Sequence, residues 1–253
     1  MKFKTILALL FSIAFLRASA QNASPDQVDT KKGPLTIQPI EHASLVLTWN
    51  NRTIYVDPTG GAEAYEGIKS PDMILLTDIH GDHLDKETLK ALSTKNAVVI
   101  APKAVADQLP ENLQQQAVVL NNGESTTQLD IPVKAIAMYN LPENADAMHP
   151  KGRGNGYVLN IGGKKIYLSG DTEGTPEMRS LKNIDVAFIC MNLPYTMDVD
   201  QAANAVLDFK PKIVYPYHYR GKNGLSDVER FKKMVNEKSK QIEVRLKNWY
   251  PES

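Results

Sequence analysis

One stretch of 13 residues, 73–85, constrains the fold more than any other part of the sequence. It begins with an apolar run over residues 73–76, which predicts a short buried strand. The turn that follows carries four side chains of the types that bind metal ions: Asp78, His80, Asp82 and His83. Imidazole nitrogens and carboxylate oxygens gathered at a strand end are typical of a metal site. The alternative is a polar loop in which Asp82 or Asp85 caps the next helix.

Two later strand ends each carry one more side chain of this kind. Asp171 and His218 both follow apolar runs, so both can reach the same edge of the core as the 78–83 turn. Taken singly, Asp171 could be a turn residue beside Gly170, and His218 could be a hydrogen-bonded core histidine. Taken together they favour a divalent metal with an open position for water, which such a metal acidifies enough to act as the nucleophile of a hydrolase.

The rest of the chain predicts one α/β domain over residues 34–253. Apolar runs of strand length predict strands over 35–40, 45–49, 53–56, 73–76, 98–101, 117–120, 126–129, 133–139, 156–161, 164–169, 185–191, 213–215 and 242–246. Helical spacing predicts helices over 85–92, 103–109, 199–209 and 227–237. Asp198 with Gln201 forms a capping box at the start of the third helix. Two runs of strands with interspersed helices indicate two sheets with helices on their outer faces.

The N-terminus has the pattern of a secretory signal peptide. Lys2 and Lys4 precede an apolar run over 6–16, and Ala18-Ser19-Ala20 supplies a small-residue cleavage site. We therefore expect a signal peptide over 1–20, a flexible polar leader over 21–33, and an exported protein, periplasmic or secreted. The apolar run is too short to span a bilayer, so we expect no integral membrane segment after cleavage.

The charge balance bears on the partners. Lys plus Arg equals Asp plus Glu at 29 each, for a formal net charge of zero. This balance argues against nucleic acid or an anionic membrane bound by bulk charge. The one cysteine, Cys190, lies in an apolar run and is expected to pack as a small hydrophobe.

Three motifs in this order resemble the metallo-β-lactamase superfamily of metal-dependent hydrolases: Asp-Ile-His-Gly-Asp-His over 78–83, Gly-Asp-Thr over 170–172, and the late His218. Flanking motifs resemble its ascorbate-phosphate-lactonase-like branch, which includes phospholipase-D-like relatives: Glu-His-Ala-Ser-Leu over 41–45, Tyr-Val-Asp-Pro over 55–58 and Tyr-Leu-Ser-Gly-Asp-Thr over 167–172. The resemblance implies a four-layer αββα sandwich, of the α/β (α+β) class, in which two mixed sheets are flanked by helices and the site lies at one edge of the sheets.

The resemblance also implies roles for individual residues, because the family motif is His-x-His-x-Asp-His. His80 matches a ligand of a first metal ion, and Asp82 and His83 match ligands of a second. Asp171 matches the carboxylate that bridges the two ions, and His218 matches the last ligand of the second.

Two positions depart from that family pattern. Asp78 stands where the first histidine is expected, and Asn140 stands where a further histidine for the first metal often stands. Aspartate oxygen is a competent ligand for zinc, manganese or iron, so Asp78 can still bind. His149 lies nine residues after Asn140 and can replace it as a ligand, or it can be a substrate-binding or surface residue.

Five further residues are candidates for supporting roles. Asp57 could orient a ligand histidine through a hydrogen bond, or it could form a plain Asp-Pro turn. His42 could line the mouth of the site or be structural. Lys151, Arg153 and Arg220 could hold an anionic substrate, although exposed cationic side chains are usually just solvated.

The resulting hypothesis is an exported metal-dependent hydrolase of a small molecule, with one or two zinc ions, or manganese or iron in their place. Asp82 or Asp171 positions the water that attacks an ester, lactone or phosphodiester. The alternative is a non-catalytic relative that binds a metal or ligand and has a degenerate first metal site. A nucleic-acid-processing member of the superfamily is disfavoured by the neutral charge and the export signal.

Overall fold

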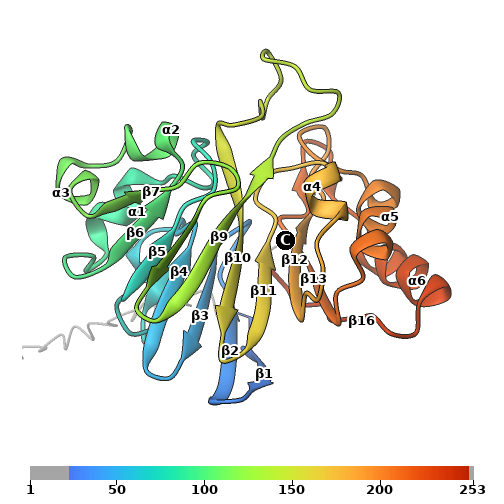
Figure 1. Cartoon of the computed structure of the whole chain (residues 1–253), viewed down its shortest axis with the longest axis horizontal. Helices are drawn as coiled ribbons and strands as arrows, with labels where there is room; N and C mark the ends of the chain where they lie inside the picture. Colours follow the sequence, from blue (N-terminus) through green and yellow to red (C-terminus); the bar gives the residue numbers. More distant parts are fainter. Residues whose placement is uncertain (1–22, 251–253) are drawn as a thin grey trace, which may run out of the picture.

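The computed structural model describes residues 23–250, and the predicted signal peptide over 1–20 lies outside them. Two mixed sheets of seven strands each pack face to face (Figure 1). In spatial order the first sheet contains β1 (Asp26–Thr30), β2 (Gly33–Pro39), β3 (Leu45–Trp49), β4 (Arg52–Val56), β5 (Met73–Leu75), β6 (Val98–Ala101) and β7 (Ala117–Val119). The second contains β16 (Glu243–Val244), β13 (Ile213–Tyr217), β12 (Val186–Cys190), β11 (Lys164–Leu168), β10 (Gly154–Ile161), β9 (Ile131–Met138) and β8 (Ser125–Gln128).

Helices cover the outer face of each sheet (Figure 1). The first sheet is accompanied by η1 (Ala62–Tyr65), α1 (Lys86–Ala91), α2 (Lys103–Ala106) and α3 (Glu111–Gln114). The second is accompanied by α4 (Pro176–Arg179), α5 (Val199–Phe209) and α6 (Val228–Lys238). A two-stranded hairpin, β14 (Arg220–Gly221) with β15 (Gly224–Leu225), follows β13. This arrangement confirms the predicted αββα sandwich. No helix within residues 23–250 is long and apolar enough to cross a membrane.

The alternation of side chains along the strands accounts for the layers. In β4, Ile54 and Val56 belong to the cluster between the two sheets, whereas Tyr55 belongs to the cluster under α1 and its neighbouring helices. Successive side chains of a strand point to opposite faces, so a strand that is apolar throughout is covered on both sides. The inner strands β5 and β12 are apolar throughout for this reason.

Two predicted helix starts are confirmed at atomic detail. Asp85 caps α1, because its carboxylate accepts hydrogen bonds from the backbone N–H groups of Glu87 and Thr88. Asp198 and Gln201 form the predicted capping box at the start of α5. Asp85 is therefore a helix cap, as predicted, and the turn just before it contains the metal-binding types of side chain over residues 78–83.

The predicted flexible leader over 21–33 is wrong for its second half. Residues Asp26–Thr30 form the edge strand β1, which pairs with β2 along its whole length, and Val28 is buried against the core. The Asp26 carboxylate accepts a hydrogen bond of 2.8 Å from the Tyr215 hydroxyl. The segment is polar because one face of an edge strand remains in solvent, and its order comes from the neighbouring strand.

Several strand ends meet at one edge of the sandwich. β4, β5 and β6 run parallel, and two antiparallel pairings bring β2 into the direction of β4. In the second sheet, β11, β12 and β13 run parallel, and two antiparallel pairings give β9 the direction of β11. The segments that leave the carboxyl ends of β2, β4, β5, β9, β11 and β13 contain the candidate site residues, so the topology gathers them.

Candidate metal centre

The structure brings together all seven predicted metal ligands, which we call the donor cluster: Asp78, His80, Asp82, His83, His149, Asp171 and His218. Within residues 23–250, three groups of potential ligand atoms each lie within 4.8 Å of one another. The first is Asp78, His80 and His149; the second is His83, Asp171 and His218; the third is His42, Asp82 and His218.

The first group contains the residue that departs from the family motif. One carboxylate oxygen of Asp78, Oδ2, contacts His80 Nδ1 and lies 3.7 Å from His149 Nε2. The other oxygen, Oδ1, lies 3.3 Å from Arg153 Nη2. Asp78 therefore presents one oxygen to two histidines while the guanidinium balances its negative charge. Two imidazole nitrogens and one carboxylate oxygen suit a divalent transition-metal ion.

The second group centres on Asp171. Its Oδ1 lies 3.2 Å from His218 Nε2, and its Oδ2 lies 3.4 Å from both His83 Nε2 and His149 Nε2. His149 belongs to the first group of donors, so the two oxygens of one carboxylate face donors of both groups. A carboxylate that faces both groups has the geometry to bridge two metal ions, which is the role that the resemblance implies for Asp171.

The hydrogen-bonding state of the cluster fits a bound cation. Asp78 Oδ2, His83 Nε2 and Asp171 Oδ1 are all buried without a hydrogen-bond partner. Buried polar atoms are normally paired, because an unpaired one costs about 1–3 kcal/mol. Three unpaired donor atoms from the two groups match the ligand set of a nitrogen- and oxygen-binding metal. The residues present therefore fit the divalent metal that the motif implies.

The electrostatics of the cluster point the same way. Burial alone would raise the pKa of Asp171, but the His218 and His83 rings hold it well below its usual value. Burial alone would lower the pKa of His218, but the Asp171 carboxylate outweighs this effect and raises the pKa to about 9. The Asp171 carboxylate therefore favours its ionised form, and it lies where positive charge is stabilised.

Asp57 orients His83, as the sequence suggested for a ligand histidine. The fully buried Asp57 carboxylate lies 2.8 Å from His83 Nδ1, and it accepts hydrogen bonds from the Thr77 backbone N–H at 2.8 Å and hydroxyl at 2.6 Å. A carboxylate bound to Nδ1 leaves Nε2 free to bind a metal. Burial raises the pKa of Asp57, although the His83 ring opposes the rise.

Asn140 positions His149. The Asn140 side-chain oxygen accepts a hydrogen bond of 2.8 Å from the His149 backbone N–H, and its side-chain nitrogen donates to the Tyr195 carbonyl at 2.8 Å. The Asn140 N–H in turn donates to the His149 carbonyl at 2.9 Å. The loop between β9 and β10 is therefore folded so that Asn140 holds the His149 backbone while the His149 ring lies beside Asp78.

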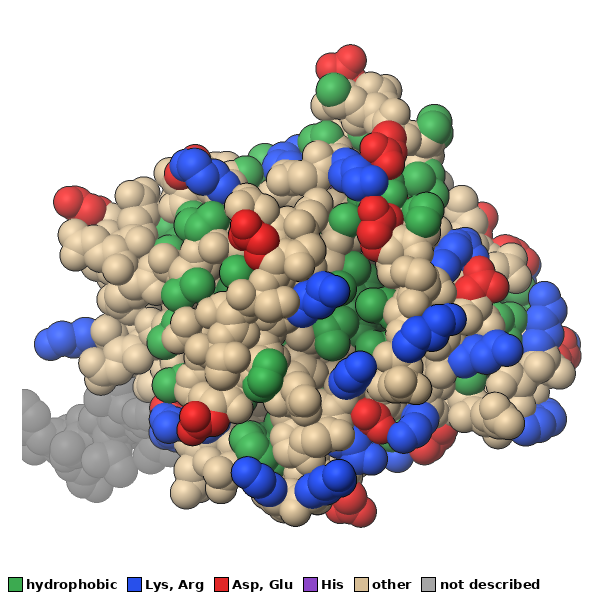
Figure 2. Space-filling model, viewed as in Figure 1, with side chains coloured by type: hydrophobic (Ala, Val, Ile, Leu, Met, Phe, Trp, Pro, Cys, Tyr) green, Lys and Arg blue, Asp and Glu red, His purple; other side chains and the backbone are tan. Residues whose placement is uncertain are grey.

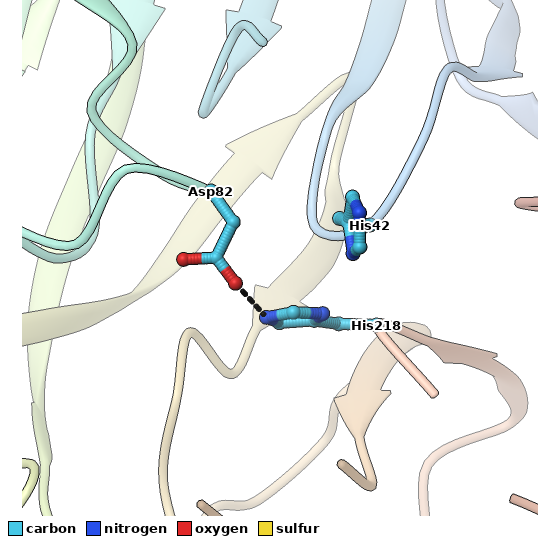
Figure 3. Close-up of side chains that lie close together, drawn as sticks. All are labelled: His42, Asp82 and His218. Carbon is cyan, nitrogen blue, oxygen red and sulfur yellow. Dashed lines mark ion pairs between the residues drawn. The ribbon is translucent and has the colours of Figure 1, made fainter. Parts of the chain in front are cut away.

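The third group, His42, Asp82 and His218, lies on the His218 side of the cluster (Figure 3). Asp82 Oδ2 lies 3.3 Å from His218 Nε2, and the His42 and His218 rings meet edge to face with centroids 5.5 Å apart. His42 Nδ1 lies 3.3 Å from the Tyr250 hydroxyl. Burial lowers the pKa of His42 to about 4, so its ring is neutral near pH 7. His42 thus borders the cluster directly.

Two predicted anion-binding residues contact other side chains of the protein. Lys151 pairs with Glu143 at 2.8 Å and Glu177 at 3.0 Å, so it faces carboxylates rather than the cluster. Arg220 lies over the Tyr250 ring at 4.3 Å, one side chain away from His42. The structure thus places Arg220 beside the cluster and Lys151 away from it.

Three contacts were not predicted from the sequence. Arg153, considered as a substrate-binding residue, instead pairs with Asp78. Thr77 completes the hydrogen bonds of Asp57, and Asn192 Nδ2 lies 3.3 Å from His218 Nε2. Thr77 adjoins the motif in sequence, which was a usable signal. Nothing in the sequence links Asn192 to His218, because β12 and β13 bring them together.

Comparisons with known proteins identify the family of this chain. A model of the β-lactamase superfamily domain matches residues 36–218. The UPF0173 metal-dependent hydrolase of Pyrococcus abyssi is 31% identical over 213 residues, which cover 79% of this chain and 92% of that protein. A candidate metal-dependent hydrolase from Parabacteroides distasonis is 39% identical, with a TM-score of 0.78 over 88% of this chain and 98% of that one.

A more distant structure shares the fold. Igni18, a metallo hydrolase from Ignicoccus hospitalis, is 23% identical, with a TM-score of 0.69 over 84% of this chain and 94% of that one. The matched span runs from β2 to the end of β13 and so includes every residue of the donor cluster. The chain therefore belongs to the metallo-β-lactamase superfamily, as one of its metal-dependent hydrolases.

Proposed function

We propose that the protein is an exported hydrolase that uses two zinc ions to cleave an ester, lactone or phosphodiester bond in a small molecule. The observation that carries the proposal is the position of Asp171. Its two oxygens lie 3.2–3.4 Å from ring nitrogens that belong to both donor groups. A carboxylate shared in this way is the usual bridge of a two-metal hydrolytic site.

The two donor groups divide the ligands between the ions. Asp78, His80 and His149 would hold one ion, and Asp82, His83 and His218 would hold the other, with Asp171 shared between them. The bound metal supplies a Lewis acid and lowers the pKa of a coordinated water. The mixed nitrogen and oxygen donors suit zinc, and manganese or iron would be accepted by the same set.

The protein's own groups provide the remaining chemistry. The side chain of Asp82 is 41% exposed, whereas the side chains of Asp78 and Asp171 are at most 4% exposed. Asp82 is therefore the carboxylate of the cluster that an entering substrate can meet. It can orient the attacking water through a hydrogen bond. Asp57, with His83 held on its carboxylate, keeps the ligand ring in a fixed tautomer.

Export belongs to the proposal because of the N-terminal pattern. Two lysines, an apolar run and Ala18-Ser19-Ala20 form the three parts of a signal peptide. N-terminal sequencing of the protein recovered from outside the cytoplasm tests this part. We expect it to begin at Gln21, and recovery of an uncleaved protein from the cytoplasm would refute export.

The hydrolase is tested by activity and metal content together. Zinc-loaded protein is assayed on ester, lactone and phosphodiester panels, beside the variants His80→Ala and Asp171→Ala. A matched control is Asp185→Asn, because Asp185 is a well-paired carboxylate at the opposite, amino-terminal end of β12.

We expect hydrolysis on at least one panel, its loss in both cluster variants, and its retention in Asp185→Asn. Zinc-replete protein that hydrolyses none of the three bond types would refute the proposal. Such a result, combined with one ion per chain, would instead support a ligand-binding relative with a degenerate first metal site.

A further inference from the structure

We propose that the substrate carries an apolar chain next to the scissile bond, and that four side chains beside the donor cluster bind this chain. We call these side chains the apolar rim: Leu141, Met148, Leu193 and Leu225. This inference rests on the proposed function, because it names the class of substrate for the same site.

The first observation is where the exposed hydrophobic residues lie. Five large hydrophobic side chains within residues 23–250 are strongly exposed: Val119 at 39%, Leu141 at 39%, Met148 at 49%, Leu193 at 48% and Leu225 at 48%. Val119 lies on β7, the edge strand of the first sheet. The other four lie in the segments that follow β9, β12 and β13, at the edge of the sandwich that contains the cluster.

Two of the four lie in the loop that positions His149. Met148 precedes His149, and its carbonyl accepts a hydrogen bond from Arg153, the partner of Asp78. Leu141 follows Asn140, whose side chain holds the His149 backbone. The loop rises above the rest of the molecule (Figure 1), and hydrophobic side chains lie along it in the space-filling view (Figure 2).

The other two lie beside His218. Leu193 follows Asn192, whose side-chain nitrogen lies 3.3 Å from His218 Nε2. Leu225 pairs with Arg220 in the hairpin that follows His218, and the Lys222 N–H of this hairpin donates to the Leu193 carbonyl at 2.8 Å. Each rim residue is thus tied to the cluster through an immediate neighbour.

The two halves of the rim are also joined to each other. The Asn140 side chain donates to the Tyr195 carbonyl at 2.8 Å, which connects the loop after β9 to the segment after β12. The two segments that carry the rim are therefore linked to each other next to the cluster. Scattered exposed hydrophobic residues are ordinary, but a group of them around a reactive centre marks a ligand-binding surface.

The charges of the loop favour a small molecule over an anionic membrane as the occupant. Glu143 and Asp146 are exposed in the loop between Leu141 and Met148, and Lys151 pairs with Glu143. The loop therefore lacks the cluster of unpaired basic residues that attracts a protein to an anionic lipid surface. An alkyl or acyl chain on a small substrate needs only the apolar side chains.

The experiment measures the dependence of kcat/KM on chain length. The zinc-loaded mature protein is assayed with p-nitrophenyl esters from acetate to octanoate, below their aggregation limits. Each methylene that the rim buries should raise kcat/KM about fourfold. The variants Leu193→Ser and Leu225→Ser should flatten this dependence. Val119→Ser is the matched control, because it removes an exposed hydrophobic side chain on β7, away from the cluster, and it should keep the full dependence.

A second measurement separates this inference from the proposed function. Binding of methylphosphonic and octylphosphonic acid to the zinc-loaded protein is compared by calorimetry. Tighter binding of the octyl compound, reduced in Leu193→Ser, would support the rim even if no ester were hydrolysed. Hydrolysis of esters without any chain-length dependence, or equal flattening in Val119→Ser, would overturn the rim and leave the hydrolase in place.

Discussion

The orientation of His83 by Asp57 gives a prediction whose size follows from the structure. The substitution Asp57→Asn keeps the shape of the side chain but removes its negative charge. The carboxylate now lies 2.6–2.8 Å from three groups: the Thr77 N–H, the Thr77 hydroxyl and His83 Nδ1. Its Oδ2 faces both the hydroxyl and the ring. An amide cannot accept from all three groups, because one of its two heavy atoms is a donor.

The consequence is a loss of metal affinity. Removal of a carboxylate that orients a ligand histidine typically weakens metal binding 10–100-fold. This corresponds to about 1.4–2.8 kcal/mol, since each factor of ten is about 1.4 kcal/mol. Because Asp57 faces the second-metal side of the cluster, we expect the weakening for the ion held by His83 and a smaller effect on the other ion.

The assay is competition for zinc against a chromophoric chelator at fixed pH. Asp72→Asn is the matched control: Asp72 accepts a backbone hydrogen bond from Thr53 and pairs with Lys69, and it immediately precedes β5, at the end of the strand opposite the cluster. Zinc affinity should fall in Asp57→Asn and stay unchanged in Asp72→Asn. Equal affinity in both variants would show that Asp57 does not support a metal ligand.

Three further predictions concern stability and metal content. The pKa of His218 in the metal-free protein is raised to about 9, so its contribution to stability is complete below pH 6.5 and is lost as the pH rises through 9. Thermal unfolding should show this loss without metal, and a zinc-loaded protein that loses as much would refute it. Gly156→Ala should cost about 1–3 kcal/mol in chemical denaturation, since an added Cβ would lie 2.8 Å from two backbone oxygens. Gly81→Ala is its control, because a Cβ added at Gly81 would have no atom within 4 Å. Equal free energies of unfolding for the two variants would contradict the packing argument. Asn140→Ala should lower the zinc content, measured by elemental analysis, from two ions per chain toward one, because the His149 backbone N–H loses its hydrogen bond to the Asn140 side chain. An unchanged zinc content would show that the loop keeps His149 in place without Asn140.

Much of the fold could be predicted because its signals are local. β3, β6 and α5 have the bounds that apolar runs and a capping box predict. The strand β1 could not be predicted, since its polar residues are ordered by pairing with β2. The predicted helix over 103–109 shortens to α2, and the four-residue helices α3 and α4 were missed. Helices of one turn offer too few residues for a periodic pattern.

The residues of the candidate site also fall into those that a local sequence signal predicts and those that depend on the path of the chain. The side chains of the 78–83 turn lie close in sequence, so their grouping was visible. To group Asp171 and His218 with this turn, we had to assume that the strands before them end at the same edge of the sheet. The parallel pairing of β11, β12 and β13 confirms that assumption. The roles of Asn140 and Arg153 depend on the path of the loop after β9, which the sequence does not specify. Asp78 looked like a weakness of the first site, and the structure pairs it with a guanidinium and two histidines.

The most direct test of the two-metal centre is crystallography of the zinc-loaded protein with data collected at the zinc absorption edge. We expect two anomalous peaks, one on each side of the Asp171 carboxylate, with Asp78, His80 and His149 around one and Asp82, His83 and His218 around the other. A single peak away from Asp78, or none within the cluster, would contradict the assignment of Asp171 as a bridge between two metal ions.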